Sequence, residues 1–132
     1  MRKKNKIIQQ LKKIFLGKKG IVFAYVHGSF LIGEKFNDID IAIYLDEKNI
    51  EKVKPVDFEI SLSLKIEEVT KFPVDVKILN FAPLSFRYHA TDGLLLFSRN
   101  ELKREEFLCK TWDEYFDFLH ISRLYLNEVL SG

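Results

Sequence analysis

The chain has 132 residues, of which 47% are hydrophobic and 30% are charged. This balance predicts a compact protein, and the length suits a single domain, residues 1–132, that buries most of the surface of its unfolded chain. The formal net charge is only +2, which argues against direct binding of nucleic acid over the whole surface.

Two further features point to the reducing cytoplasm. No apolar stretch reaches the roughly 20 residues that a membrane-spanning helix needs, and the basic start is not followed by the apolar run of a secretory signal before Gly17. The single cysteine, Cys109, excludes an internal disulfide and a cysteine-based metal cluster. We expect Cys109 to fill a helix interior, and we expect a cytoplasmic protein with no membrane partner.

The first predicted element is an amphipathic helix at residues 3–16. Its apolar residues recur at helical spacing and would form one buried stripe: Ile7, Ile8, Leu11, Ile14 and Phe15. Lysines crowd the first twenty residues. They are typical of a solvated helix face, and a patch that faces a partner or RNA is the alternative.

A glycine–serine turn joins the next two predicted elements, strands at residues 21–27 and 38–45. Gly28 lets the backbone approach a phosphate closely, and Ser29 adds a hydroxyl next to N–H groups that could bind an anion. Asp38 and Asp40 are two residues apart, so they would share one face of an extended strand. Paired carboxylates repel each other unless a divalent cation lies between them. Each motif alone is common in loops and turns, but the combination indicates phosphoryl or nucleotidyl transfer.

A third carboxylate lies in the middle of the chain. Residues 46–56 are charged and indicate a loop or short helix, and residues 57–71 indicate a helix with Phe58, Leu62, Ile66 and Val69 inward, although residues 59–64 also alternate like a strand. The next strand, residues 73–79, carries Asp75 between valines. A carboxylate there is costly unless it lies at an edge or meets a cation.

The last third predicts a short helix from Pro83, a strand at residues 94–98 and a long helical region at residues 100–130. The long region is rich in aromatic residues: Phe107, Trp112, Tyr115, Phe116, Phe118 and Tyr125. Packing on the sheet is their default role, but one helix buries only one stripe. Some of these residues could therefore serve an interface with a partner.

Gly28-Ser29, Asp38-x-Asp40 and Asp75 together resemble the signature of the DNA polymerase β-like nucleotidyltransferase superfamily. Residues 74–88 and 93–97 resemble one branch, the minimal nucleotidyltransferases, and the whole length resembles the MntA-type antitoxins of that branch, which pair with a HEPN-domain toxin. The resemblance covers roughly residues 5–130. It implies an α/β, polymerase β palm-like fold with a mixed β-sheet, flanking helices and a long C-terminal helical region.

The resemblance also implies a reaction. Asp38, Asp40 and Asp75 would be the catalytic residues and would hold two Mg²⁺ ions, with Gly28 and Ser29 binding the nucleotide. ATP would donate AMP to a tyrosine hydroxyl of the HEPN toxin, so the chain would act as an antitoxin, in a hetero-oligomer with its partner.

Two departures from the family pattern keep other functions open. The connection between Ser29 and Asp38 is shorter than in most relatives, and Leu31-Ile32 precedes Gly33 where many relatives carry Ala-Arg. One alternative is a catalytically weak antitoxin that neutralises its partner by contact, and another is a nucleotidyltransferase for a small molecule or RNA. His27, Arg87 and Tyr88 could reach the nucleotide or could be structural.

Overall fold

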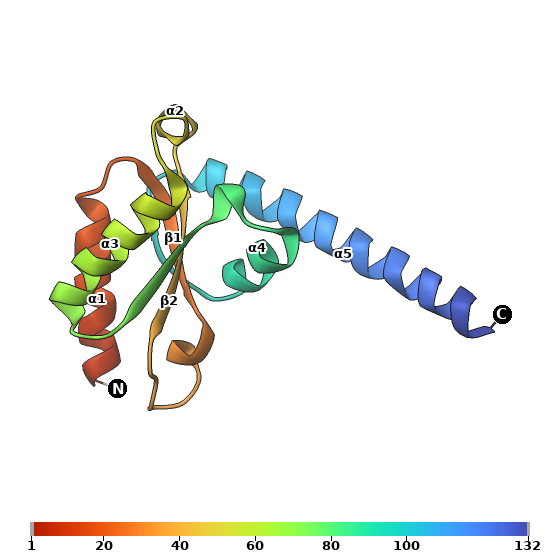
Figure 1. Cartoon of the computed structure of the whole chain (residues 1–132), viewed down its shortest axis with the longest axis horizontal. Helices are drawn as coiled ribbons and strands as arrows, with labels where there is room; N and C mark the ends of the chain where they lie inside the picture. The colour runs from red at the N-terminus through yellow and green to blue at the C-terminus, as the bar shows by residue number, and fades with distance from the viewer. Residues whose placement is uncertain (1, 132) are drawn as a thin grey trace.

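The computed structural model describes residues 2–131 (Figure 1). The α-helices are α1 (Arg2–Leu16), α2 (Glu47–Ile50), α3 (Pro55–Thr70), α4 (Leu84–Thr91) and α5 (Glu101–Ser131). The strands are β1 (Ile21–His27), β2 (Ile39–Leu45), β3 (Val74–Ile78) and β4 (Leu94–Ser98). Two short 3₁₀ helices, η1 (Gly28–Leu31) and η2 (Leu79–Phe81), follow β1 and β3.

The four strands form one sheet in the order β3-β2-β1-β4. Strand β1 pairs antiparallel with β2 and β4, whereas β2 pairs parallel with β3. The parallel pair needs a crossover, and α3 is the main element of that connection. The predicted α/β fold with a mixed sheet, flanking helices and a long C-terminal helix is therefore confirmed.

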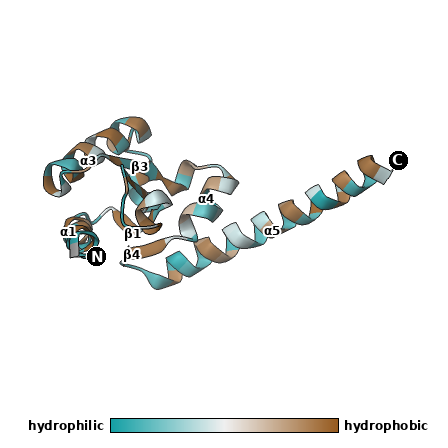
Figure 2. Cartoon of the chain, turned by 90° about the horizontal axis from the view of Figure 1, so that it is seen from below, coloured by the Kyte–Doolittle hydropathy of each residue, from teal (hydrophilic) through white to brown (hydrophobic). Residues whose placement is uncertain are grey.

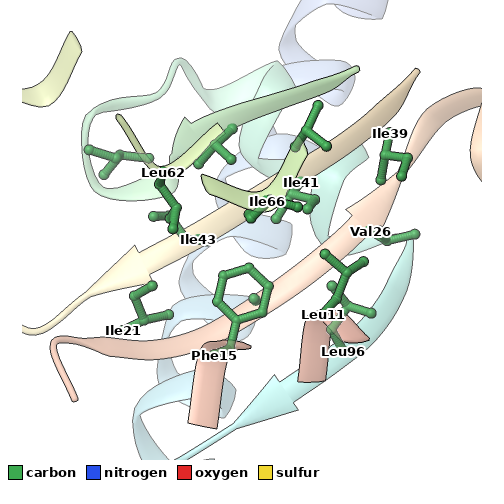
Figure 3. Packing of buried hydrophobic residues seen from close by; sticks show 14 of the residues in the cluster. Leu11, Phe15, Ile21, Val26, Ile39, Ile41, Ile43, Leu62, Ile66 and Leu96 are labelled. Atoms are coloured by element: carbon green, nitrogen blue, oxygen red, sulfur yellow. The ribbon is translucent and has the colours of Figure 1, made fainter. Parts of the chain in front are cut away.

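The helices form a layer on each side of the sheet (Figure 1). Ile39, Ile41 and Ile43 of β2 point toward α1 and α3, where they join the main hydrophobic core with Leu11, Phe15, Leu62 and Ile66 (Figure 3). The opposite face holds a smaller core that α4 and α5 cover, with Phe23, Tyr25, Ala42, Leu79 and Ala90. Because strand side chains alternate, Asp40, which lies between Ile39 and Ile41, points to the α4–α5 side.

Helix α3 covers the free edge of β3 with polar side chains. Three backbone N–H groups of β3 donate to three side chains of α3: Val74 to Glu67 at 2.9 Å, Val76 to Ser63 at 3.1 Å and Ile78 to Glu59 at 2.8 Å. The acceptors are four residues apart and so lie on one side of the helix. This arrangement pairs edge N–H groups that would otherwise be open to another strand, and it gives a role to two of the polar residues in the stretch 59–64, Glu59 and Ser63.

Some details of the predicted core are wrong. Val69 is 45% exposed and Thr70 is buried in its place, because a helical repeat that contains Leu62 and Ile66 reaches residue 70. In α1, Ile7, Leu11 and Phe15 are buried, but Ile8 and Ile14 are only partly buried.

Cys109 also differs from expectation. It lies on α5 but is exposed, because it falls on the side of the helix that faces away from the sheet.

None of the helices in residues 2–131 is both long and apolar enough to cross a bilayer.

Candidate active site

The predicted site lies where β1 ends and β2 begins, and Gly28 and Asp40 meet there. His27 is the register partner of Asp40 in the β1–β2 pair, which brings the Gly28 turn beside the start of β2. Gly28 has a φ of 77°, a left-handed conformation that favours glycine. A Cβ at this position would also overlap the Oδ2 atom of Asp40. Only glycine leaves room for the carboxylate at this point.

Asp40 and Asp75 lie side by side on neighbouring strands. They are register partners in the parallel pair of β2 and β3, and neighbouring strands are about 4.8 Å apart. Val74 and Val76, on either side of Asp75, belong to the main core, so Asp75 points to the same side of the sheet as Asp40. The sheet therefore brings together two carboxylates that are 35 residues apart in the sequence.

Asp38 lies just outside β2 and is exposed, yet its charge reaches the pair. Burial raises the pKa of Asp40 above its ordinary value, and the negative charge of Asp38 raises it further. The charge of His27 lowers the pKa of Asp40, and the charge of Asp75 raises it by a smaller amount. The three carboxylates thus form one electrostatic group in which negative charge is in excess.

These carboxylates are oxygen donors of the kind that Mg²⁺ prefers. Within residues 2–131, however, no three His, Cys, Asp or Glu side chains are arranged as a group that could hold a metal ion. The donor chemistry still fits, because Mg²⁺ is usually held by one or two protein carboxylates together with substrate phosphates. A divalent cation would also relieve the repulsion that, after burial, raises the pKa of Asp40.

His27 is a half-buried neighbour of the carboxylates. Burial lowers its pKa, and the charges of Asp40 and Asp75 only partly offset this effect. Its ring meets Phe86 of α4 edge-on at 5.3 Å, and its Nε2 atom is buried with no hydrogen-bond partner among the described residues. The histidine therefore has both a packing contact and an unused polar atom at the site.

The short connection between Ser29 and Asp38 is held by aromatic packing. Phe30 is buried and meets Phe36 at 4.8 Å, and Phe36 meets Phe72 at 4.9 Å. Lys4 of α1 lies over the Phe30 and Phe36 rings and donates to the carbonyl of Gly33. Although this connection is short, these contacts hold it against α1 and Phe72. Ser29 is exposed at the start of η1.

Arg87 and Tyr88 both contact α5. Arg87 pairs with Glu114 of α5 at 3.5 Å, and the Tyr88 ring stacks on that of Tyr115 at 4.0 Å.

One residue at the site was not predicted from the sequence. Lys77 lies 4.0 Å from the carboxylate of Asp75, and the only signal for it was its spacing of two residues along the strand.

Comparison with known proteins identifies a family and a shared fold. Residues 9–102 match the family model described as "Polymerase beta, Nucleotidyltransferase". No curated protein matches the chain. Solved structures match over almost their whole length, and at identities of 19–20% the three described below show a shared fold alone.

One of these structures is the toxin–antitoxin complex MntA–HepT, with 19% identity, 97% of each chain covered and a TM-score of 0.65. A second is a toxin–antitoxin with AMP-PNP, with 19% identity, a TM-score of 0.69, and coverage of 90% of this chain and 96% of the other. A third is the tri-AMPylated HEPN toxin of Shewanella oneidensis in complex with MNT antitoxin, with 20% identity, a TM-score of 0.66, and coverage of 97% and 96%. The family model spans well over half of the chain, and this protein therefore belongs to the polymerase β nucleotidyltransferase family.

Proposed function

We propose that this chain is a cytoplasmic, Mg²⁺-dependent adenylyltransferase that transfers AMP from ATP to a tyrosine hydroxyl of a HEPN toxin, and so acts as its antitoxin. The observation that carries the proposal is the pairing of Asp40 with Asp75 beside the Gly28 turn. Family membership gives the reaction class, and the carboxylates provide the negative site that a metal–triphosphate complex needs.

The proposed roles follow from the position of each residue. Asp38 and Asp40 would hold two Mg²⁺ ions, and Asp75 would complete the second site. When bound, the ions would neutralise the triphosphate and stabilise the attacking and leaving oxygens. Gly28 and Ser29 would bind the phosphates, since the glycine leaves the backbone open there.

The transfer itself is a substitution at the α-phosphorus of ATP. The acceptor hydroxyl oxygen forms a bond to this phosphorus, and the bond from the phosphorus to the bridging oxygen breaks, so pyrophosphate leaves. Asp75 would accept the hydroxyl proton, because it is exposed and close to Asp40. Asp40 would stay ionised when its repulsion is relieved by metal.

The solved structures with this fold support a protein acceptor. The matching chains come from three structures. These are MntA with HepT, a toxin–antitoxin with AMP-PNP, and MNT antitoxin with an AMPylated HEPN toxin. The present chain covers more than nine-tenths of each of those chains.

Label transfer from α-³²P-ATP to a purified cognate HEPN protein tests the proposal. The wild-type chain should label that protein in Mg²⁺, and Asp38→Asn with Asp40→Asn should abolish labelling while the fold survives. A double variant that labels the partner at the wild-type rate would show that these carboxylates are not the catalytic ligands. A wild-type chain that silences the toxin without labelling it would instead support neutralisation by contact.

Calorimetry tests the metal requirement separately. Because ATP and the carboxylates are both anionic, ATP binding should be strong in Mg²⁺ and weak in EDTA. Equal affinity in both conditions would contradict the metal-bridged site.

A further inference from the structure

The C-terminal half of α5 extends beyond the sheet and the other helices, which we call the body of the protein. Helix α5 has 31 residues, and the last aromatic ring in contact with another element is that of Phe116, 5.8 Å from the Tyr88 ring. Figure 1 shows the rest of the helix running away from the sheet. We call residues 117–131 the overhang. At 1.5 Å per residue it is about 22 Å long, or four turns.

The overhang repeats the pattern of the half of α5 that packs on the body. Four residues of the packed half contact the sheet or α4 at alternate steps of four and three: Arg104, Leu108, Thr111 and Tyr115. The same alternation continues through Phe118, Ser122, Tyr125 and Val129. We call these last four residues the seam. A 3.5-residue repeat keeps one side of a helix facing a partner along its whole length, so the seam continues a packed face past the point where the body ends.

The seam lies in a larger apolar surface. Seven apolar side chains of the overhang are more than half exposed: Phe118, Ile121, Leu124, Tyr125, Leu126, Val129 and Leu130. Figure 2 shows hydrophobic residues recurring along the outer half of α5. Exposed apolar side chains gathered on one helix are typical of a surface that a partner covers.

The position of the overhang favours the acceptor protein over a second copy of this chain. Helix α5 packs on the face of the sheet that carries the smaller core, and Asp40 and Asp75 point to that same face. A protein seated on the overhang therefore lies on the side of the sheet from which an acceptor hydroxyl must approach. Pairing of two copies through the overhang would instead occupy that side without providing an acceptor.

We propose that the overhang is the docking helix for the HEPN toxin. This inference rests on the proposed function, because it takes the acceptor from there. The inference adds the contact surface. The seam contacts the toxin, and because the toxin then lies on the same side of the sheet as Asp40 and Asp75, its target tyrosine can approach the carboxylates.

A matched pair of double variants tests the seam. Tyr125→Lys with Val129→Lys places two charges on it, and Asn127→Lys with Ser131→Lys places two charges at the same spacing about 200° round the helix. Lysine is a good helix former, and circular dichroism and ATP binding should be unchanged in both. Titration with a purified cognate HEPN protein should show affinity about 100-fold lower for the seam variant and within about threefold of wild type for the control.

Three outcomes would overturn the proposal. The first is a seam variant that binds the HEPN protein as wild type does. The second is a control variant that loses as much affinity as the seam variant. The third is a wild-type chain that is dimeric alone by light scattering, with a mass that halves in the seam variant while the HEPN protein still binds.

A different result marks failure of the proposed function alone. Asp38→Asn with Asp40→Asn should keep wild-type affinity for the HEPN protein, because neither residue lies on α5. If this variant still labels the partner while the seam variant fails to bind it, the catalytic assignment is wrong and the docking surface stands.

Discussion

The Oδ2 atom of Asp40 occupies the space that a Cβ atom at position 28 would need. Gly28 also has a left-handed φ of 77°, so backbone conformation and close approach select glycine together. The turn and the carboxylate are therefore a single structural unit, although twelve positions separate them in the sequence.

Gly28→Ala should abolish label transfer because the new methyl group displaces the Asp40 carboxylate. The left-handed backbone adds a cost of about 1–2 kcal/mol in the free energy of unfolding. Gly33→Ala is the matched control, since Gly33 has a similar φ of 73° but nothing lies within 4 Å of its Cβ position. Denaturant melts should show a loss in both variants, and only the control should keep activity. Normal transfer by Gly28→Ala would contradict the close approach.

Asp40→Asn should stabilise the metal-free protein at neutral pH. Burial and then Asp38 raise the folded-state pKa of Asp40 above the ordinary value of 3.8, so the folded protein binds this proton more tightly than the unfolded chain. The free energy of unfolding therefore falls as the pH rises from about that ordinary value through the raised pKa, and asparagine removes this loss. Thermal melts in EDTA between pH 3 and pH 8 should show a higher melting temperature for the variant only at the upper end.

Asp113→Asn, on an exposed part of α5, controls for the loss of one negative charge. A rise in melting temperature of the same size in both variants would mean that net charge, and not the carboxylate group at the site, causes the effect.

Glu67→Ala should weaken the edge of β3. The side chain accepts the backbone N–H of Val74 at 2.9 Å, and its removal leaves a part-buried donor unpaired at a cost of about 1–3 kcal/mol. Glu68→Ala is the neighbouring control, because Glu68 is exposed and its loss should change stability by less than about 0.5 kcal/mol. Hydrogen exchange at the Val74 amide should accelerate only in the first variant. Equal exchange rates in the two variants would show that the glutamate does not protect this edge.

Two tyrosines of α5 should respond differently to truncation. Tyr115 stacks on Tyr88 at 4.0 Å, and an aromatic pair contributes about 0.5–1.5 kcal/mol beyond the area that it buries. Tyr115→Ala should therefore lower the free energy of unfolding by at least that amount. Tyr125 is 66% exposed, so Tyr125→Ala should leave stability within about 0.5 kcal/mol of wild type. Urea unfolding of the isolated chain distinguishes the two, and a large loss for Tyr125→Ala would show that the overhang packs on the body.

Local patterns in the sequence were enough to predict the strands and the main helices. Strands β1 and β4 begin and end where predicted, and the other strands and the main helices differ by one or two residues at their ends, because alternation and helical spacing report which side of an element is buried. The glycine–serine turn and the carboxylates could also be found in this way, since their chemistry is readable from residue types and short spacings. The family followed from the same residues and is confirmed by the family model.

The tertiary structure decided which distant residues meet. The pairing of Asp40 with Asp75 depends on the parallel register of β2 and β3, and strand register across a crossover is not encoded in any local spacing. Likewise, the aromatic residues of α5 look alike in the sequence. The body ends near Phe116, so Phe107 packs on Phe23 and Tyr44 whereas Tyr125 remains exposed. Periodicity gives the side of a helix that is apolar, but only the folded chain determines how much of that side is covered, because coverage depends on where the neighbouring elements stop.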